Sequence, residues 1–251
     1  MKPLEERFVD HPSLALEQCH DAINDMAAKA KENLFLSFGL IHSFSKENYE
    51  RIQLIENVVD RYEDKLGTYL LKITGKEMND EQNERTGKFL HTINDFERIS
   101  DHAVNLAEVA KEIYEKKVVF SDDAKNELCV VENAVAEIVT MAIDSFINND
   151  LQLAEKIEPL EELIDYLCEE LKLHHIQRLK KGFCSISSGF IFNDILNNYE
   201  RIADHCSNIA VAMIALESDS FDTHEYLDSL KQLKNETYAK YFDVYSRKYV
   251  I

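Results

Sequence analysis

Apolar positions recur along this chain with the spacing of helices. In the segment 52–73 they alternate in steps of three and four residues, as in a helix packed lengthwise in a bundle. The segment 153–171 repeats this spacing, and Pro159 lies inside it, where we expect a kink. No apolar-polar alternation is long enough to predict a strand. The pattern therefore predicts an all-α protein.

Capping and turn residues divide this pattern into helices. Ser45, Asn79 and Ser121 are suited to capping helix N-termini, and Gly75 is suited to ending a helix. Asp222 is a further predicted cap, for a last helix that runs to the C-terminus. The predicted helices cover about 13–44, 46–74, 80–117, 122–148, 151–181, 190–216 and 223–251.

The chain contains a duplication. Residues 94–107 return as residues 197–210 with eight of fourteen positions identical, where chance would give about one. Residues 55–60 return as residues 160–165, at an offset that differs by only two residues. We infer two units of three helices each. The predicted fold is two tandem antiparallel three-helix bundles, with domains at 1–118 and 119–217, followed by a C-terminal helical tail at 218–251.

Acidic side chains gather on one face of the repeated helices. Glu97 and Asp101 lie on one side of the third helix, opposite its apolar positions. Two carboxylates on one helix cannot complete the shell of a cation that needs six oxygens. The second helix adds Glu56, which counting from the connecting loop places nearly level with Glu97. We therefore predict one metal site in each unit, formed by Glu56, Asp60, Glu97 and Asp101 and by Glu161, Asp165, Glu200 and Asp204.

Each of these residues also has a structural interpretation. Acids on one helix face are most often simply solvated, and a duplication copies inert residues as well. Arg98 and Arg201 follow the repeated Glu and fit ordinary ion pairs that tie helices together. His102 and His205 point away from the acidic face and fit hydrogen-bonding roles. If metal binds, oxygen ligands suit Mg²⁺, Ca²⁺, Mn²⁺ or Fe³⁺ better than structural Zn²⁺.

Composition restricts the function further. The chain has 251 residues and a net charge of −19, which argues against nucleic acid and against an anionic membrane surface as partners. Five scattered cysteines form neither a zinc knuckle nor a disulfide framework, so we expect buried thiols in a reducing cytosol. No glycine-rich phosphate loop and no nucleophile with its base is present, so the sequence gives no case for an enzyme.

The repeated motif resembles that of the PhoU family. Glu97-Arg98-Ile99-Ser100-Asp101-His102 and Glu200-Arg201-Ile202-Ala203-Asp204-His205 are similar to the acidic motif on the third helix of each PhoU bundle. The likeness covers roughly residues 15–217. It implies two three-helix bundles and a non-enzymatic regulatory module of phosphate transport and homeostasis. It also implies metal ions at the acidic motifs, with Fe, Zn, Mn or Mg as the candidates.

A narrower resemblance concerns the partner. Residues 4–17 and 158–179 resemble the cytosolic C-terminal PhoU-like region of bacterial Na⁺/phosphate cotransporter-related proteins. This implies that the chain contacts the membrane domain of a phosphate transporter, on the same full-length chain or a separate one, or an associated sensor protein. The location implied is cytoplasmic, at the inner face of the membrane. A homodimer is a further expectation, and nucleic acid is not expected as a partner.

Two questions stay open from the sequence. Glu17-Gln18-Cys19-His20 matches the Glu-x-x-His of di-iron bundles, which makes a ferritin-like di-metal carboxylate oxidoreductase the second functional hypothesis, although such sites need two of these motifs. In the tail, an aromatic stripe either docks on the protein's own bundles or binds a partner or a second copy. The stripe consists of Tyr238, Tyr241, Tyr245 and Tyr249.

Overall fold

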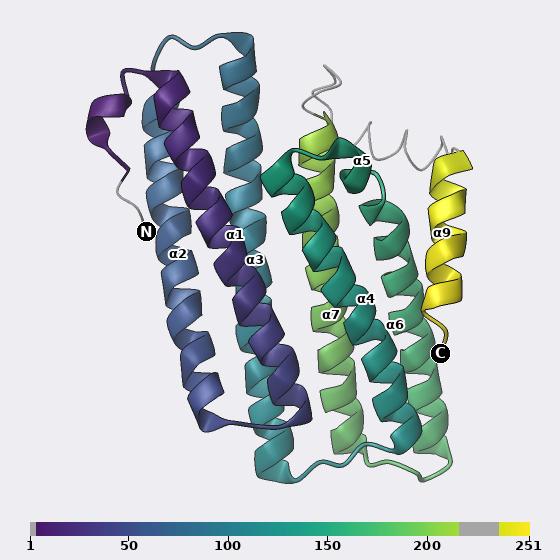
Figure 1. Ribbon diagram of the computed structural model, residues 1–251. Coiled ribbons are helices and arrows are strands. Elements are labelled where there is room, and N and C mark those ends of the chain that lie inside the picture. Colours follow the sequence, from purple (N-terminus) through teal and green to yellow (C-terminus); the bar gives the residue numbers. More distant parts are fainter. Residues whose placement is uncertain (1–3, 216–235) are drawn as a thin grey trace.

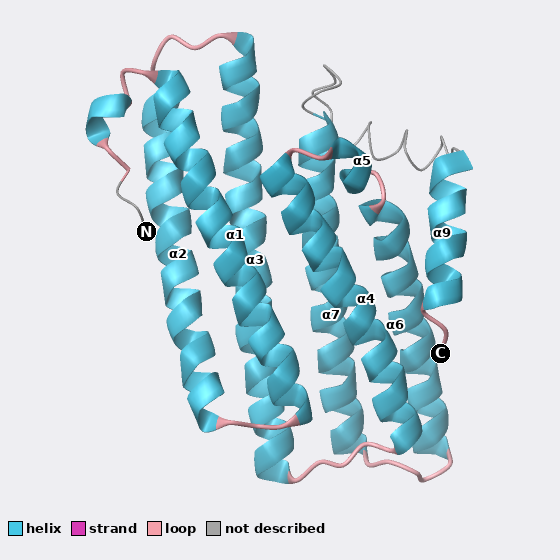
Figure 2. Ribbon diagram, viewed as in Figure 1, coloured by secondary structure: helices cyan, strands magenta, loops and turns pink. Residues whose placement is uncertain are grey.

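Helices form all the regular structure in the residues that the computed structural model describes, 4–215 and 236–251 (Figure 2). None of these helices is both long and apolar enough to cross a membrane. Their bounds are η1 Glu6–Phe8, α1 Pro12–His42, α2 Lys46–Thr74, α3 Asp80–Lys116, α4 Asp122–Asn148, α5 Leu151–Ala154, α6 Ile157–Lys180, α7 Ile186–Ala215 and α9 Glu236–Lys248.

The predicted caps begin three of the long helices. Ser45 and Ser121 each accept a hydrogen bond from the backbone N–H three residues ahead, both at 3.3 Å. Asn79 accepts from the backbone N–H of Gln82 at 2.8 Å, and the Gln82 side chain accepts in return from the backbone N–H of Asn79 at 3.1 Å. These bonds satisfy N–H groups that have no partner inside the helix. The predicted starts of α2, α3 and α4 are therefore confirmed.

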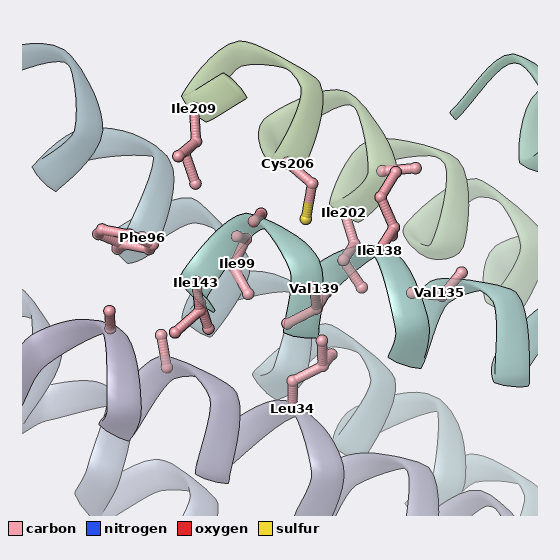
Figure 3. Close-up of a cluster of buried hydrophobic side chains, with 14 of the residues drawn as sticks. Leu34, Phe96, Ile99, Val135, Ile138, Val139, Ile143, Ile202, Cys206 and Ile209 are labelled. Carbon is pink, nitrogen blue, oxygen red and sulfur yellow. The ribbon is translucent and has the colours of Figure 1, made fainter. Parts of the chain in front are cut away.

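The helices form two antiparallel three-helix bundles side by side (Figure 1). The first contains α1, α2 and α3, and the second contains α4, α6 and α7. The two bundles meet where α3 packs against α7 and α1 against α4. Side chains from these four helices share one apolar core, which includes Leu34, Phe96, Val139 and Ile202 (Figure 3). The predicted fold class is confirmed, while the domain boundaries at 118 and 217 stay predictions.

Two helix boundaries differ from the prediction. Pro159 does not kink a continuous helix, because the chain breaks after the short helix α5 and α6 starts at Ile157. Pro159 thus lies in the first turn of α6, where its missing N–H costs no hydrogen bond. The next helix, α7, starts at Ile186 rather than after Gly189. Gly189 leaves room there for His175, whose Nε2 would lie 3.0 Å from an added Cβ.

The cysteines are all free, but they are not all buried. Cys19, Cys168 and Cys206 lie in the core, as predicted. Cys129 is exposed and Cys184 is only half-buried. The expectation was wrong for these two residues because one lies on an outward face of α4 and the other in the turn between α6 and α7.

The tyrosine stripe of the tail docks on the second bundle. Tyr245 and Tyr249 are buried, and α9 packs along α6. The Tyr245 hydroxyl lies 3.6 Å from the Met141 Sδ of α4, and Lys248 Nζ lies 2.8 Å from Glu137 Oε1 of the same helix. This confirms the interpretation of an additional core helix. The predicted helix start at Asp222 lies outside the described residues.

Removing residues 236–251 is expected to lower the free energy of unfolding by about 2–4 kcal/mol, because two buried tyrosines lose their packing. Urea unfolding followed by circular dichroism measures the change. Val244→Ser is the matched control, since Val244 is exposed on the same helix and should leave stability unchanged. Unchanged stability of the truncated chain together with an altered oligomeric state would instead assign α9 to a partner.

Candidate metal centre

Three carboxylates converge between α6 and α7. Glu161 and Asp165 lie one turn apart on α6, and Asp204 faces them from α7; one oxygen of each lies within 4.8 Å of the other two. Oxygens that bind one hard cation at about 2.0–2.6 Å are up to about 5 Å apart. We call these three residues the second-bundle acidic cluster. It is the only such group of three among the residues that the structure describes.

The electrostatics of this cluster favour a cation. Burial, followed by the charges of Asp204 and Glu200, raises the pKa of Asp165 to about 6. The Oδ1 atom of Asp165 is buried and has no hydrogen-bond partner. A buried carboxylate oxygen without a donor is costly, and a bound cation removes that cost. The residues present therefore fit a hard metal ion.

The fourth predicted ligand of the second bundle is held elsewhere. Both carboxylate oxygens of Glu200 accept hydrogen bonds from Lys172 Nζ at 2.8 Å. The sequence analysis did not predict this role of Lys172. An alignment of the two units would have indicated it, because the corresponding residue of the first unit is Gly67, which has no charge. The ion pair supplies Glu200 with a cation from the protein itself. Glu200 thus borders the second-bundle acidic cluster without joining it.

The first bundle arranges its acids differently. Burial, and then the charge of Asp101, raises the pKa of Glu97 to about 7, and Glu63 adds a smaller effect. The pKa of Glu56 is raised by burial and by Asp101 and Asp60. Glu56 thus interacts with Asp101, and Glu63 interacts with Glu97. The sequence had predicted instead that Glu56 and Glu97 lie nearly level on the two helices. Sequence reasoning missed Glu63, although it lies seven residues after Glu56 on the same face of α2.

The repeated arginines form ion pairs, but within one helix. Arg98 Nη1 lies 3.0 Å from Asp101 Oδ2, and Arg201 Nη1 lies 3.3 Å from Asp204 Oδ2. The expectation that they tie two helices together was wrong, because residues three apart are neighbours on a helix surface. Both arginines are more than half exposed, so these pairs add little stability.

The repeated histidines link the two bundles. His205 Nδ1 donates to Asp95 Oδ1 at 2.9 Å, and His102 Nδ1 donates to Asn198 Oδ1 at 2.8 Å. Each bond joins α3 to α7, and the two imidazole ring centres lie 5.6 Å apart. The predicted hydrogen-bonding role of these histidines is confirmed.

The Glu-x-x-His motif of α1 does not form a metal site. Glu17 is exposed on the surface. His20 instead stacks on Phe89, with ring centres 5.9 Å apart, and burial together with the charge of Arg85 lowers its pKa. A cationic neighbour and an aromatic neighbour are poor surroundings for a metal ligand. The ferritin-like alternative is therefore not favoured.

Comparisons with known proteins agree with this fold. The PhoU domain matches residues 23–110 and again residues 130–213, once in each bundle. A crystal structure of PhoU from Pseudomonas aeruginosa superposes with a TM-score of 0.75 at 19% identity, covering 80% of this chain and 96% of that one. The phosphate transport system regulatory protein PhoU from Streptococcus pneumoniae also gives 0.75, at 17% identity, covering 84% and 99%.

Two sequence relatives complete the comparison. A "phosphate-specific transport system accessory protein PhoU homolog 1" from Thermotoga maritima is 26% identical over 125 residues, which is 50% of this chain and about half, 53%, of the relative. A "phosphate-specific transport system accessory protein PhoU homolog" from Clostridium acetobutylicum is 20% identical over 205 residues, 80% of this chain and 91% of the relative. With a matching domain in each of its two bundles, this chain belongs to the PhoU family.

Proposed function

We propose that this chain is a non-enzymatic regulatory protein of phosphate transport, which acts through contacts with the membrane domain of a phosphate transporter. The observation that supports this most is that the PhoU domain matches both bundles. The relatives from Thermotoga maritima and Clostridium acetobutylicum are described as accessory proteins of phosphate-specific transport. An associated sensor protein is a second partner in this proposal, and the inner face of the membrane is its place of action.

We further propose that the regulation depends on a metal ion at the second-bundle acidic cluster. Its ligands are carboxylate oxygens, without cysteine or histidine, which suits Mg²⁺, Mn²⁺ or Fe³⁺ and makes Zn²⁺ the least suited candidate. The bound cation would neutralise Asp165 and Asp204 and hold α6 against α7. A partner would then contact a face of the second bundle on which α6 and α7 are held in one arrangement.

Phosphate uptake in cells of the source organism tests the proposal. Cells that lack the chain should lose the dependence of uptake rate on external phosphate, and re-expression of the natural chain should restore it. Asp204→Asn should fail to restore it, whereas Asp144→Asn should restore it, because Asp144 is exposed on α4 and is not part of the cluster. Uptake that responds normally to phosphate without the chain would contradict the proposal.

A further inference from the structure

The α6–α7 hairpin has a charge opposite to that of the whole chain. Residues 171–193 contain four cations but no Asp or Glu, in a chain whose net charge is −19. Lys172 is paired with Glu200 and Arg178 with Glu127, so the free charge of the hairpin comes from Lys180 and Lys181. Lys180 and Lys181 are exposed, and neither forms an ion pair within the described residues. The whole-chain charge, which argues against an anionic membrane surface, therefore does not describe the turn of this hairpin.

Large apolar side chains project from the same hairpin. Phe183 in the turn is 71% exposed, and Ile186 and Phe190, one turn apart at the start of α7, are 73% and 69% exposed. The third phenylalanine of the hairpin, Phe192, is fully packed against His175 at a ring distance of 4.7 Å. Phe192 therefore anchors the start of α7 in the core, while the three other apolar side chains are exposed.

A neighbouring loop continues this surface. The α3–α4 connection, 117–121, lies at the same end of the molecule as the α6–α7 turn (Figure 1). The loop contacts the first turns of α7, since Phe120 packs edge-on against Phe192 with ring centres 5.7 Å apart. This loop also carries a lysine and an apolar residue that are both exposed. The lysine is Lys117, and the apolar residue is Val119, which is 79% exposed. The acids that follow the loop lie in the first turns of α4. Asp122 pairs with Lys125 at 3.1 Å and Glu127 with Arg178 at 2.7 Å, while Asp123 is exposed.

We propose that this end of the second bundle binds an anionic phospholipid bilayer directly. Phe183, Ile186 and Phe190 enter the headgroup region, while Lys180 and Lys181 contact lipid phosphates. The chemistry of this surface favours a bilayer over a protein partner. Its free lysines match lipid phosphates, and its exposed apolar side chains match the acyl region just below them.

Tryptophan fluorescence tests this with the full chain, which contains no Trp. Phe183→Trp places a single probe at the turn, and Leu71→Trp places one at an equally exposed position at the far end of α2. With vesicles that contain 30% phosphatidylglycerol, emission of the Phe183→Trp protein should shift to the blue, and that of the Leu71→Trp protein should not. The shift should weaken in high salt, because the lysine–phosphate attraction is screened.

Matched charge changes complete the test. Lys180→Glu with Lys181→Glu, in the Phe183→Trp background, should weaken vesicle binding at least about tenfold. Arg61→Glu with Lys65→Glu, which reverses two exposed cations on α2, should leave binding unchanged. The proposal is overturned if the turn probe does not shift, if both probes shift alike, or if vesicles of neutral phosphatidylcholine bind equally well. A shift with soluble poly-glutamate but not with vesicles would replace the bilayer with an acidic polypeptide. No transporter is present in this experiment, so its result is independent of the proposed function.

Discussion

The double substitution Asp165→Asn with Asp204→Asn is expected to abolish tight metal binding by the second bundle. The change removes two of the three carboxylates of the second-bundle acidic cluster, and affinity for hard cations depends on the number of charged ligands. We expect the dissociation constant for Mn²⁺ to rise at least about a hundredfold. Calorimetric titration measures the constant, and circular dichroism should show unchanged helicity.

Two further variants distinguish the cluster from its neighbours. Glu200→Gln should cost much less affinity than Asp204→Asn, because Lys172 already holds both oxygens of Glu200. Asp101→Asn, at the corresponding position of the first bundle, should also have the smaller effect, since the described residues gather three carboxylates only in the second bundle. An equal loss in Glu200→Gln and Asp204→Asn would show that the ligand set is wrong.

Glu97→Gln is expected to stabilise the metal-free protein at pH 8 by about 1–2 kcal/mol. Burial and Asp101 raise the pKa of Glu97 from 4.5 to about 7, so between these values the folded state binds more protons than the unfolded state. The stability linked to this group is fully present below pH 4.5 and is lost as the pH rises through 7. Thermal unfolding in EDTA at pH 5 and pH 8 should therefore show the benefit of Glu97→Gln only at the higher pH.

Asp60→Asn is the control for this effect. Asp60 belongs to the same acidic face, but it is exposed, and its removal should change stability by less than about 0.5 kcal/mol. A loss of stability in Glu97→Gln at pH 8 would contradict the prediction and would identify Glu97 as a structural ion-pair partner of Arg98, which lies 3.4 Å away.

Local signals in the sequence predicted most of the fold. Ser45, Asn79 and Ser121 cap helices because their side-chain oxygens accept a hydrogen bond from the backbone N–H three residues ahead. This bond forms within one helical turn and does not depend on the rest of the chain. The internal duplication then fixed the pairing of helices into two bundles. Pro159 shows where this fails, because the same residue fits a kink in one long helix or the first turn of a new one. Packing of α5 and α6 decides between them.

The candidate site was predicted only in part, because its geometry depends on contacts between helices. The acids of the second-bundle acidic cluster were named from their place on one helix face and from their repetition in the two units. Which of them meet depends on how far one helix is displaced along the other, and a pattern within one helix does not contain that displacement. Lys172 shows a second reason, since its counterpart in the first unit is Gly67. Glu200 therefore has a lysine partner from the neighbouring helix that Glu97 does not have.

The histidine contacts between α3 and α7 have a consequence for the origin of the chain. Asp95 and Asn198 occupy equivalent positions in the two units, and so do His102 and His205. His205 of the second unit bonds to Asp95 of the first, and His102 of the first unit bonds to Asn198 of the second. The pair of contacts is therefore the same when the two units are exchanged. This is the geometry of an isologous interface, normally found between identical subunits. The chain thus has the form of a symmetric dimer whose two protomers have become one polypeptide.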